Sequence, residues 1–241
     1  MRKSHITAVV AVALLICATF AFANRPATNG SQNPPNAELR AKLTAARIAA
    51  VGQPLVINGT QVCGPTGDST DDKIKELDNN RNRTDEPSAN GYIPVGWDVV
   101  EDLPAPKAAE VIPHLPWEPA VPVEPAQGDF QGAPVQVIGF LHLVKAEGGE
   151  SANCHLTGAN EVDWQMHLMK NKQDIGGAIV VEATPRVRLG HKWTLAALQA
   201  INKDKPVRIS GWLLYHSAWQ IHPITKIEEQ DAHGNWVNIE K

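Results

Sequence analysis

Groups capable of chemistry are concentrated between residues 153 and 188. Within this short segment the sequence places a thiol, two imidazoles, a carboxylate and two guanidinium groups: Cys154, His155, His167, Glu182, Arg186 and Arg188. Guanidinium groups bind anions through paired hydrogen bonds, a carboxylate can act as a general base, and imidazole, thiolate and carboxylate are ligands of zinc. This segment is therefore the first place to look for a binding or catalytic site.

Two predicted strands position these groups. Residues 163–169 alternate between polar and apolar side chains, so Trp164, Met166 and Leu168 are expected to face a core and His167 to face away from it. Residues 178–183 predict the neighbouring strand because they form a short, mostly apolar run.

The pleat of the second strand, continued through residue 188, puts Glu182, Arg186 and Arg188 on one face. We expect these three residues, together with His167, to line the surface that binds a ligand. The alternative is a set of ion pairs across a half-exposed sheet, which are common and contribute little to stability.

Three histidines and one carboxylate suggest a second hypothesis, a zinc site. Its candidate ligands are His155, His167, Glu182 and His222, since zinc accepts mixed nitrogen, oxygen and sulfur ligands. Their spacing matches no short ligand repeat. The alternative is that these histidines are satisfied by hydrogen bonds to the backbone.

The C-terminal half predicts a mainly β fold. Strands are expected at 135–143, 163–169, 178–183, 207–215 and 219–228, with a helix at 193–201 and a small extra strand at 236–239. One helix between the third and fourth of five strands is the element order of a small OB-fold-like barrel. Gly139 and Gly211 fall inside the first and fourth strands, where a barrel bends or brings backbones close together.

Short helices and a proline-rich extended segment precede the barrel. Helices are predicted at 37–51, from about Ser69 onward, and at 97–103, and the prolines of 104–134 favour an extended backbone. We expect residues 37–133 to form an extension packed on the barrel, and residues 134–241 to form the barrel itself.

The N-terminus predicts export. Arg2 and Lys3 precede an apolar run that ends in Ala21-Phe22-Ala23, the pattern of a secretory signal peptide over residues 1–23. Residues 24–36 are polar and proline-rich, and we expect a disordered leader there. The protein is then periplasmic or extracellular, with no membrane span after cleavage. A retained membrane anchor is the alternative.

The charge balance narrows the possible partners, and the cysteine count suggests a disulfide. Cleavage would remove two basic residues and leave 20 Lys and Arg against 26 Asp and Glu, an acidic balance that argues against general nucleic-acid binding. The mature chain would retain Cys63 and Cys154, which invites a disulfide in an exported protein. The competing possibility is that Cys154 is a free thiol beside His155.

Several motifs together resemble a family of exported bacterial proteins of uncharacterised activity. They are Asn153-Cys154-His155, Val162–His167, Val180–Arg188, Ile209–Leu213 and Ile221–Thr225, with Pro94–Trp97 upstream. The resemblance implies a bacterial source, export and a one-domain protein with a C-terminal OB-like barrel, and it carries no activity or residue roles. The chain is more loosely similar to OB-barrel nucleases, but it lacks their Asp-rich strand motif.

The sequence therefore favours an exported OB-like binding module for an unknown ligand. The alternative is a metal-dependent hydrolase acting on phosphodiesters or a related anionic substrate, with zinc as its metal. The two hypotheses differ in whether His155, His167, Glu182 and His222 converge on one point.

Overall fold

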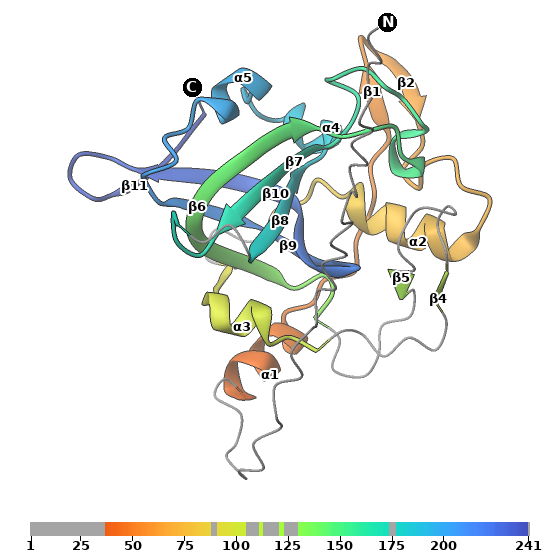
Figure 1. The fold of residues 1–241 in the computed structure, drawn as a ribbon. Helices are drawn as coiled ribbons and strands as arrows, with labels where there is room; N and C mark the ends of the chain where they lie inside the picture. Colours follow the sequence, from red (N-terminus) through yellow and green to blue (C-terminus); the bar gives the residue numbers. More distant parts are fainter. Residues whose placement is uncertain are drawn as a thin grey trace, which may run out of the picture. The chain divides into compact units, whose positions relative to one another are not determined.

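Five strands between Pro134 and Gln230 close into a barrel (Figure 1). They are β6 (Pro134–Ala146), β7 (Trp164–Met169), β8 (Ala178–Ala183), β9 (Val207–His216) and β10 (Ala218–Gln230). Strand β6 pairs with β7, β7 with β8, β10 with β9, and β9 with β6, all antiparallel. Strands β8 and β10 pair in parallel and complete the circle. This pairing is that of a five-stranded OB barrel, so the predicted fold is confirmed.

The computed structural model describes residues 37–87, 91–104, 111–112, 121–122, 130–173 and 177–240. All of them belong to one compact unit, Asn36–Lys241. The predicted signal peptide and leader lie outside the described residues, as does most of the predicted proline-rich segment 104–134. Within the described ranges, no helix has both the length and the apolar character needed to cross a membrane.

Alternating side chains of the five strands fill the barrel interior. Trp164, Met166 and Leu168 are at most 2% exposed, as the alternation of β7 predicts. Val181 of β8 and Ile221 of β10 are opposite each other across the parallel pair, and neither is exposed. The residues that follow these inward positions on each strand therefore point out of the barrel, which determines where the polar groups lie.

Two glycines allow the close approaches that the barrel requires. A Cβ atom at Gly139 would lie 2.6 Å from the carbonyl oxygen of Met169, and one at Gly211 would lie 2.4 Å from that of Pro223. Real Cβ atoms do not come so near to backbone atoms, and any larger residue would push the strands apart. The prediction for both positions is confirmed.

Two short helices connect β8 to β9, and the predicted continuation of the β8 pleat to residue 188 is wrong. Strand β8 ends at Ala183, and the chain turns at once into α4 (Pro185–Arg188), followed by α5 (Leu195–Gln199). Thr184 caps α4 by accepting a hydrogen bond from the Val187 amide at 3.3 Å, and Pro185 takes the first helical position. The pleat of β8 therefore does not continue to Arg186 and Arg188.

The extension contributes short elements, of which the described ones are α1 (Ala37–Ala45), β1 (Leu55–Ile57), β2 (Thr60–Cys63), α2 (Asp72–Arg81), β3 (Ile93–Pro94), α3 (Trp97–Glu101), β4 (Val111–Ile112) and β5 (Val121–Pro122). A 3-10 turn, η1 (Ser151–Asn153), lies between β6 and β7, and β11 (Trp236–Asn238) pairs with the end of β10. Helix α1 is shorter than predicted, whereas α2 and α3 begin close to the expected positions. Asp71 caps α2 by accepting from the amides of Lys73 and Ile74 at 2.9 and 3.2 Å.

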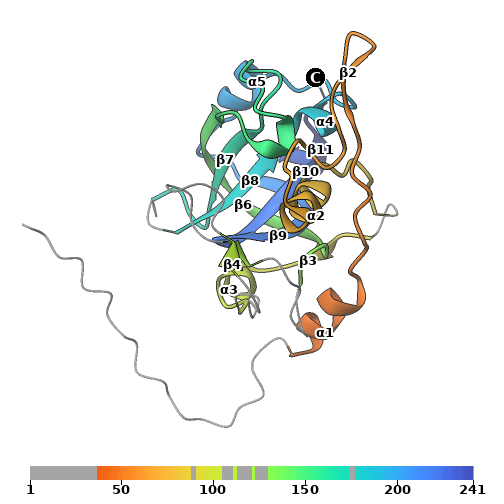
Figure 2. The ribbon, with the colours of Figure 1, turned by 90° about the vertical axis from the view of Figure 1, so that its right-hand side faces the viewer.

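Helix α2 and the residues after it pack against the outside of the barrel (Figure 2). Leu77 of α2 forms a small apolar cluster with Leu214 of β9, and both side chains are buried. The guanidinium of Arg83 lies 3.3 Å from the ring centre of Trp212, whose indole nitrogen donates to the Asp85 carbonyl at 3.1 Å. The outward faces of β9 and β10 are therefore covered by protein, which decides how exposed their polar residues are.

Candidate functional site

Three side chains on adjacent segments of the barrel form a buried cluster beneath the extension. Asp163 directly precedes β7, Glu182 lies in β8, and His222 lies in β10. Because Val181 and Ile221 are paired and point inward, the next residues on these parallel strands, Glu182 and His222, are neighbours on the outward side. The cluster therefore belongs to the outer surface of the barrel and not to its core.

The imidazole of His222 lies between the two carboxylates. Its Nε2 atom is 3.2 Å from Oδ2 of Asp163, and its Nδ1 atom is 3.4 Å from Oε2 of Glu182. The three residues are 1–3% exposed. Each can offer one ligand atom such that all three atoms lie within 4.8 Å of one another. The geometry brings together Glu182 and His222, two of the four predicted metal ligands, and adds Asp163.

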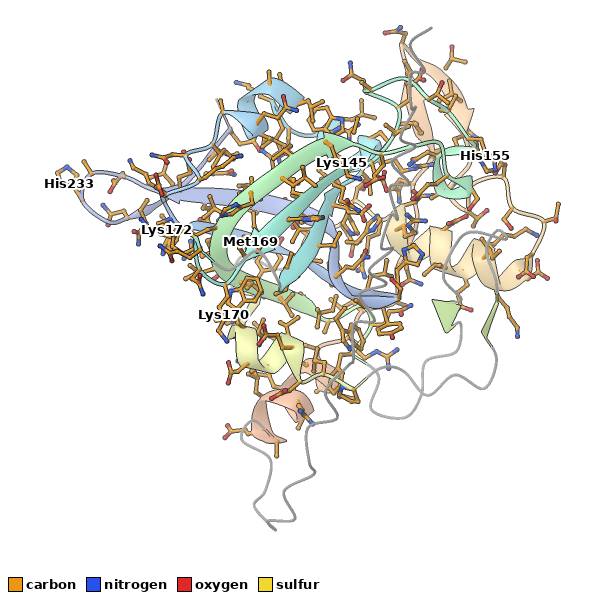
Figure 3. All side chains as sticks on the ribbon, in the orientation of Figure 1. Lys145, His155, Met169, Lys170, Lys172 and His233 are labelled. Atoms are coloured by element: carbon orange, nitrogen blue, oxygen red, sulfur yellow. A yellow bond between two sulfur atoms is a disulfide. The ribbon has the colours of Figure 1, made fainter. Side chains whose placement is uncertain are left out.

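The other two predicted metal ligands lie elsewhere. The side chain of His155 is 58% exposed, and its Nε2 atom lies 3.5 Å from Oδ1 of Asp68. Figure 3 shows His155 on the side of the barrel where β1 and β2 lie, away from Lys145 and Met169. His167 points outward from β7 and is partly exposed, and burial together with Lys145 lowers the pKa of its imidazole.

A network of buried charges surrounds the Asp–His–Glu cluster. Oδ1 of Asp163 accepts from the Asn153 amide at 2.9 Å. Arg81, which is 1% exposed, pairs with Glu150 and lies 3.8 Å from Asp78. Burial works against the charge on Arg81, but the surrounding carboxylates outweigh it and raise the pKa of this guanidinium. Arg81 therefore remains charged inside the protein.

The two carboxylates of the cluster are held in different electrostatic states. Burial alone would raise the pKa of Asp163, but His222, Arg81 and the hydrogen bond from Asn153 hold it well below its usual range. Burial raises the pKa of Glu182 to about 7, and the charge of Asp163 acts in the same direction. Of the two carboxylates, Glu182 is therefore the more easily protonated.

Arg186 does not line an open ligand surface. It is 3% exposed, and its donors reach the carbonyls of Gln53, Gly64 and Ala152 at 2.7, 3.0 and 3.0 Å and Oδ1 of Asn153 at 2.7 Å. All of its hydrogen bonds in the described structure therefore go to the segments that cover the cluster. Burial lowers the pKa of this guanidinium to about 10, so it is charged at neutral pH.

Arg188 is similarly buried. Its guanidinium donates to the carbonyls of Ala183, Asn160 and Val162, and it lies 3.9 Å from the ring centre of Trp164. Burial lowers its pKa to about 10. Both arginines hold backbone carbonyls in place near the end of β8, because α4 turns them away from the outward face of that strand.

A covering layer, residues 53–85 and 147–163, closes over the cluster. Its two parts are joined by a disulfide between Cys63 and Cys154, with an S–S distance of 2.04 Å. Asn82 also ties them together by donating to the Ala152 carbonyl at 3.0 Å. The predicted pairing of Cys63 with Cys154 is borne out in the structure, and the alternative of a free thiol at Cys154 is not.

The outward face of β6 and β7 remains accessible. Paired strands and a bulge between Leu141 and Val144 bring together His142, Leu143, Lys145, Gln165 and His167, which we call the β6–β7 face. Beside it is a hollow of about 180 Å³ whose lining includes His142, Leu143, Gln199 and Lys203. Nε2 of His142 is buried and has no hydrogen-bond partner among the described residues. This face can accept a ligand without any rearrangement of the covering layer.

Asp163, Arg81 and Asn153 were missed as members of the buried network. The alternation of residues 163–169 placed Asp163 on the same face as His167, but it contained no information about which part of that face is covered. Arg81 lies in α2 and Asn153 in η1, far from Glu182 in sequence. The sequence signal for this network was the run of charged and amide residues in α2. Two of these residues, Asp78 and Arg81, are buried in the structure.

Comparisons with known proteins add little to this description. No family model matches the sequence, and no curated protein matches it. Among solved structures, the crystal structure of the S. pombe Stn1–Ten1 complex aligns with 42% of this chain and 60% of the matched chain, at 11% identity and a TM-score of 0.28. The match thus spans less than two thirds of that chain. So slight a likeness carries no argument, and the OB assignment rests on the strand pairing alone.

Proposed function

We propose that this chain is an exported OB-fold binding module that holds a polar, uncharged ligand, of the oligosaccharide class, on the β6–β7 face. OB barrels use the outward face of their second and third strands, here β7 and β8, to bind oligosaccharides or oligonucleotides. On β8 that face is buried at Glu182 beneath the covering layer. The accessible part therefore lies over β7 and its other neighbour, β6.

The observation that carries this proposal is the unsatisfied ring nitrogen of His142 beside the hollow. A buried polar atom without a partner costs free energy, and a ligand hydroxyl that reached it would remove that cost. The volume of about 180 Å³ is below the range of pockets that enclose a whole small molecule. The hollow is suited to one unit of an extended ligand that continues across Gln165 and His167.

The charges around the face favour a neutral ligand over a polyanion. Three lysines near it have carboxylate partners: Lys145 with Glu147 at 3.1 Å, Lys170 with Glu101 at 3.5 Å, and Lys172 with Asp204 at 3.5 Å. A fourth, Lys203, lines the hollow itself. Lys145 lies near the start of β7, whereas Lys170 and Lys172 follow the end of that strand (Figure 3). Nucleic-acid affinity depends on lysine and arginine that are free to neutralise phosphates.

Export is supported by the disulfide and by the N-terminal sequence. Disulfides persist in oxidising compartments and are rare in the reducing cytosol. The pairing of Cys63 with Cys154 therefore supports a periplasmic or extracellular location, which remains a proposal, as does the bacterial source. The metal-dependent hydrolase is not favoured. Of its four predicted zinc ligands, Glu182 and His222 are sealed from any polymeric substrate, and the β6–β7 face contributes only His167.

Binding can be tested with defined probes. The purified protein is titrated with neutral tetrasaccharides (chitotetraose, cellotetraose and maltotetraose) and with a short oligothymidylate, while amide chemical shifts are recorded. We expect one tetrasaccharide to shift the resonances of β6 and β7, with an affinity that does not depend on salt. His142→Ala and His167→Ala should each weaken this binding about tenfold, which corresponds to about 1.4 kcal/mol.

His233→Ala is the matched control, because it removes an exposed histidine from the turn between β10 and β11 (Figure 3). It should leave the affinity unchanged. Stronger and salt-dependent binding of the oligothymidylate would overturn the ligand class. Shifts confined to another surface, or no response to any probe, would overturn the site.

A further inference from the structure

The buried cluster of Asp163, Glu182 and His222 leaves its facing atoms unsatisfied. Oδ2 of Asp163, Oε2 of Glu182 and both ring nitrogens of His222 make no well-aligned hydrogen bond among the described residues, although Oδ2 lies 3.2 Å from Nε2 and Oε2 lies 3.4 Å from Nδ1. These atoms are buried, so they also lack the solvent that would satisfy them on a surface. Unpaired buried polar groups are costly, and those of native proteins have a cause.

Neither nitrogen–oxygen pair has the geometry of a well-aligned hydrogen bond. A proton on each nitrogen would therefore form bent hydrogen bonds. A metal ion can instead sit between ligand atoms that do not point directly at one another. Ligands at about 2.0–2.1 Å from a tetrahedral zinc ion are roughly 3.3–3.4 Å apart. One ion would take a single ring nitrogen of His222 together with one oxygen of each carboxylate, and such a set of atoms lies within 4.8 Å here, so the ligands would have to close in slightly around the ion.

The donor set also fits a divalent transition metal. Imidazole nitrogen and carboxylate oxygen are both ligands of zinc and of similar ions, whereas calcium and magnesium prefer oxygen ligands alone. We propose that Asp163, Glu182 and His222 bind a zinc-like divalent cation beneath the covering layer. A second oxygen of either carboxylate, or a water molecule, would complete the coordination.

Residues next to the proposed ligands hold them by hydrogen bonds, as residues around known metal sites do. Asn153 donates to Oδ1 of Asp163 and so leaves Oδ2 directed at the cluster, and Arg186 in turn holds Asn153 at 2.7 Å. Such outer hydrogen bonds fix the orientation of metal ligands. The charge of Arg81, which also lies beside Glu150 and Asp78, acts on both carboxylates.

The proposed metal would be structural. It would connect β8, β10 and the end of the β6–β7 connection at the point where the covering layer joins the barrel, because the three ligands come from those segments. The ion would lie in a closed position, away from the β6–β7 face. This inference is therefore independent of the proposed ligand binding, and either can fail without the other.

The metal is tested on the full chain, purified without a chelating column. Elemental analysis should find about one equivalent of zinc or a related ion, EDTA should lower the melting temperature, and added zinc should restore it. Glu182→Gln and Asp163→Asn should each weaken zinc binding by at least tenfold, measured by competition with a chromogenic chelator.

Glu228→Gln is the matched control. Glu228 is 3% exposed and lies in β10 like His222, but it pairs with Arg208 at 2.6 and 2.7 Å and takes no part in the cluster. This variant should bind zinc as the unaltered protein does. Cobalt in place of zinc should give visible absorption that Glu182→Gln changes and Glu228→Gln does not.

Two results would overturn the proposal. One is an unaltered protein that contains no metal and whose melting temperature responds to neither EDTA nor added zinc, manganese or cobalt. The other is unchanged zinc affinity in folded Glu182→Gln and Asp163→Asn. If those variants do not fold, the response of the unaltered protein to EDTA and zinc still decides the question. Imidazole nitrogen shifts typical of a doubly protonated ring at neutral pH would show a proton in place of the metal.

Discussion

The disulfide between Cys63 and Cys154 should supply a large part of the stability of this protein. The two residues are 91 positions apart, and the cross-link closes a long loop that includes α2, α3 and β6. The loss of chain entropy in the unfolded state predicts about 4–5 kcal/mol for a loop of this length. Typical domains are stable by about 5–15 kcal/mol in total.

The folded arrangement of the covering layer should survive loss of the bond. Arg186 connects Gln53 and Gly64 on one side with Ala152 and Asn153 on the other, so the two parts remain joined without the sulfurs. The effect is therefore expected in the unfolded state. The folded spectra should be unchanged, while the urea midpoint should fall.

The assay is urea unfolding followed by tryptophan fluorescence, on the oxidised protein, on the protein reduced with dithiothreitol, and on the Cys63→Ser, Cys154→Ser double variant. The reduced protein and the double variant should agree with each other and lie about 4–5 kcal/mol below the oxidised protein. The double variant should not respond to dithiothreitol. A difference below about 1 kcal/mol between the oxidised and reduced forms would refute the entropic argument.

Three further predictions concern the same interface and its surroundings. Arg186→Met removes four hydrogen bonds and leaves buried acceptors unsatisfied, so it should cost at least about 3 kcal/mol in urea unfolding, whereas Lys75→Met, at an exposed pair, should cost less than about 1. Leu77→Ala and Leu214→Ala should each destabilise by about 2–4 kcal/mol, and a double-mutant cycle that showed purely additive losses would contradict their contact. Burial raises the pKa of Tyr92 to about 12, so folding stability should decline as the pH rises from about 10 to 12, and Tyr92→Phe should remove that decline together with the late step in phenolate absorbance.

The barrel could be predicted because its signals are local. Each strand carries its own alternation, and the order of five strands with one helix before the fourth matches few folds. The turn at Thr184-Pro185 was equally local, since a capping threonine followed by proline is a helix-start signal. The strand of residues 178–183 ends at Ala183, so extending its alternation to residue 188 wrongly predicts Arg186 and Arg188 on the outward face of β8.

The burial of Glu182 could not be predicted from such a local pattern. Alternation correctly puts it on the outward face of β8, and an outward residue in an isolated barrel would be solvated. It is buried because η1 and α2 pack over that face, and those contacts join residues some 30 to 100 positions away in the chain. A periodic pattern reports which side of a strand a residue lies on, but not what covers that side.

The covering layer therefore divides the outward surface of the barrel into two parts with different chemistry. Over β8 and β10 it removes solvent from Asp163, Glu182 and His222, so that they interact strongly with one another, or with a cation, and with no external ligand. Over β6 and β7 it leaves the side chains of His142 and His167 partly exposed, although Nε2 of His142 is buried. A histidine and a carboxylate on adjacent strands would suggest one catalytic centre in the sequence, but the covering layer separates the buried cluster from the accessible β6–β7 face. The same separation explains why substitutions at Glu182 should affect stability and metal content, while substitutions at His167 should affect ligand affinity alone.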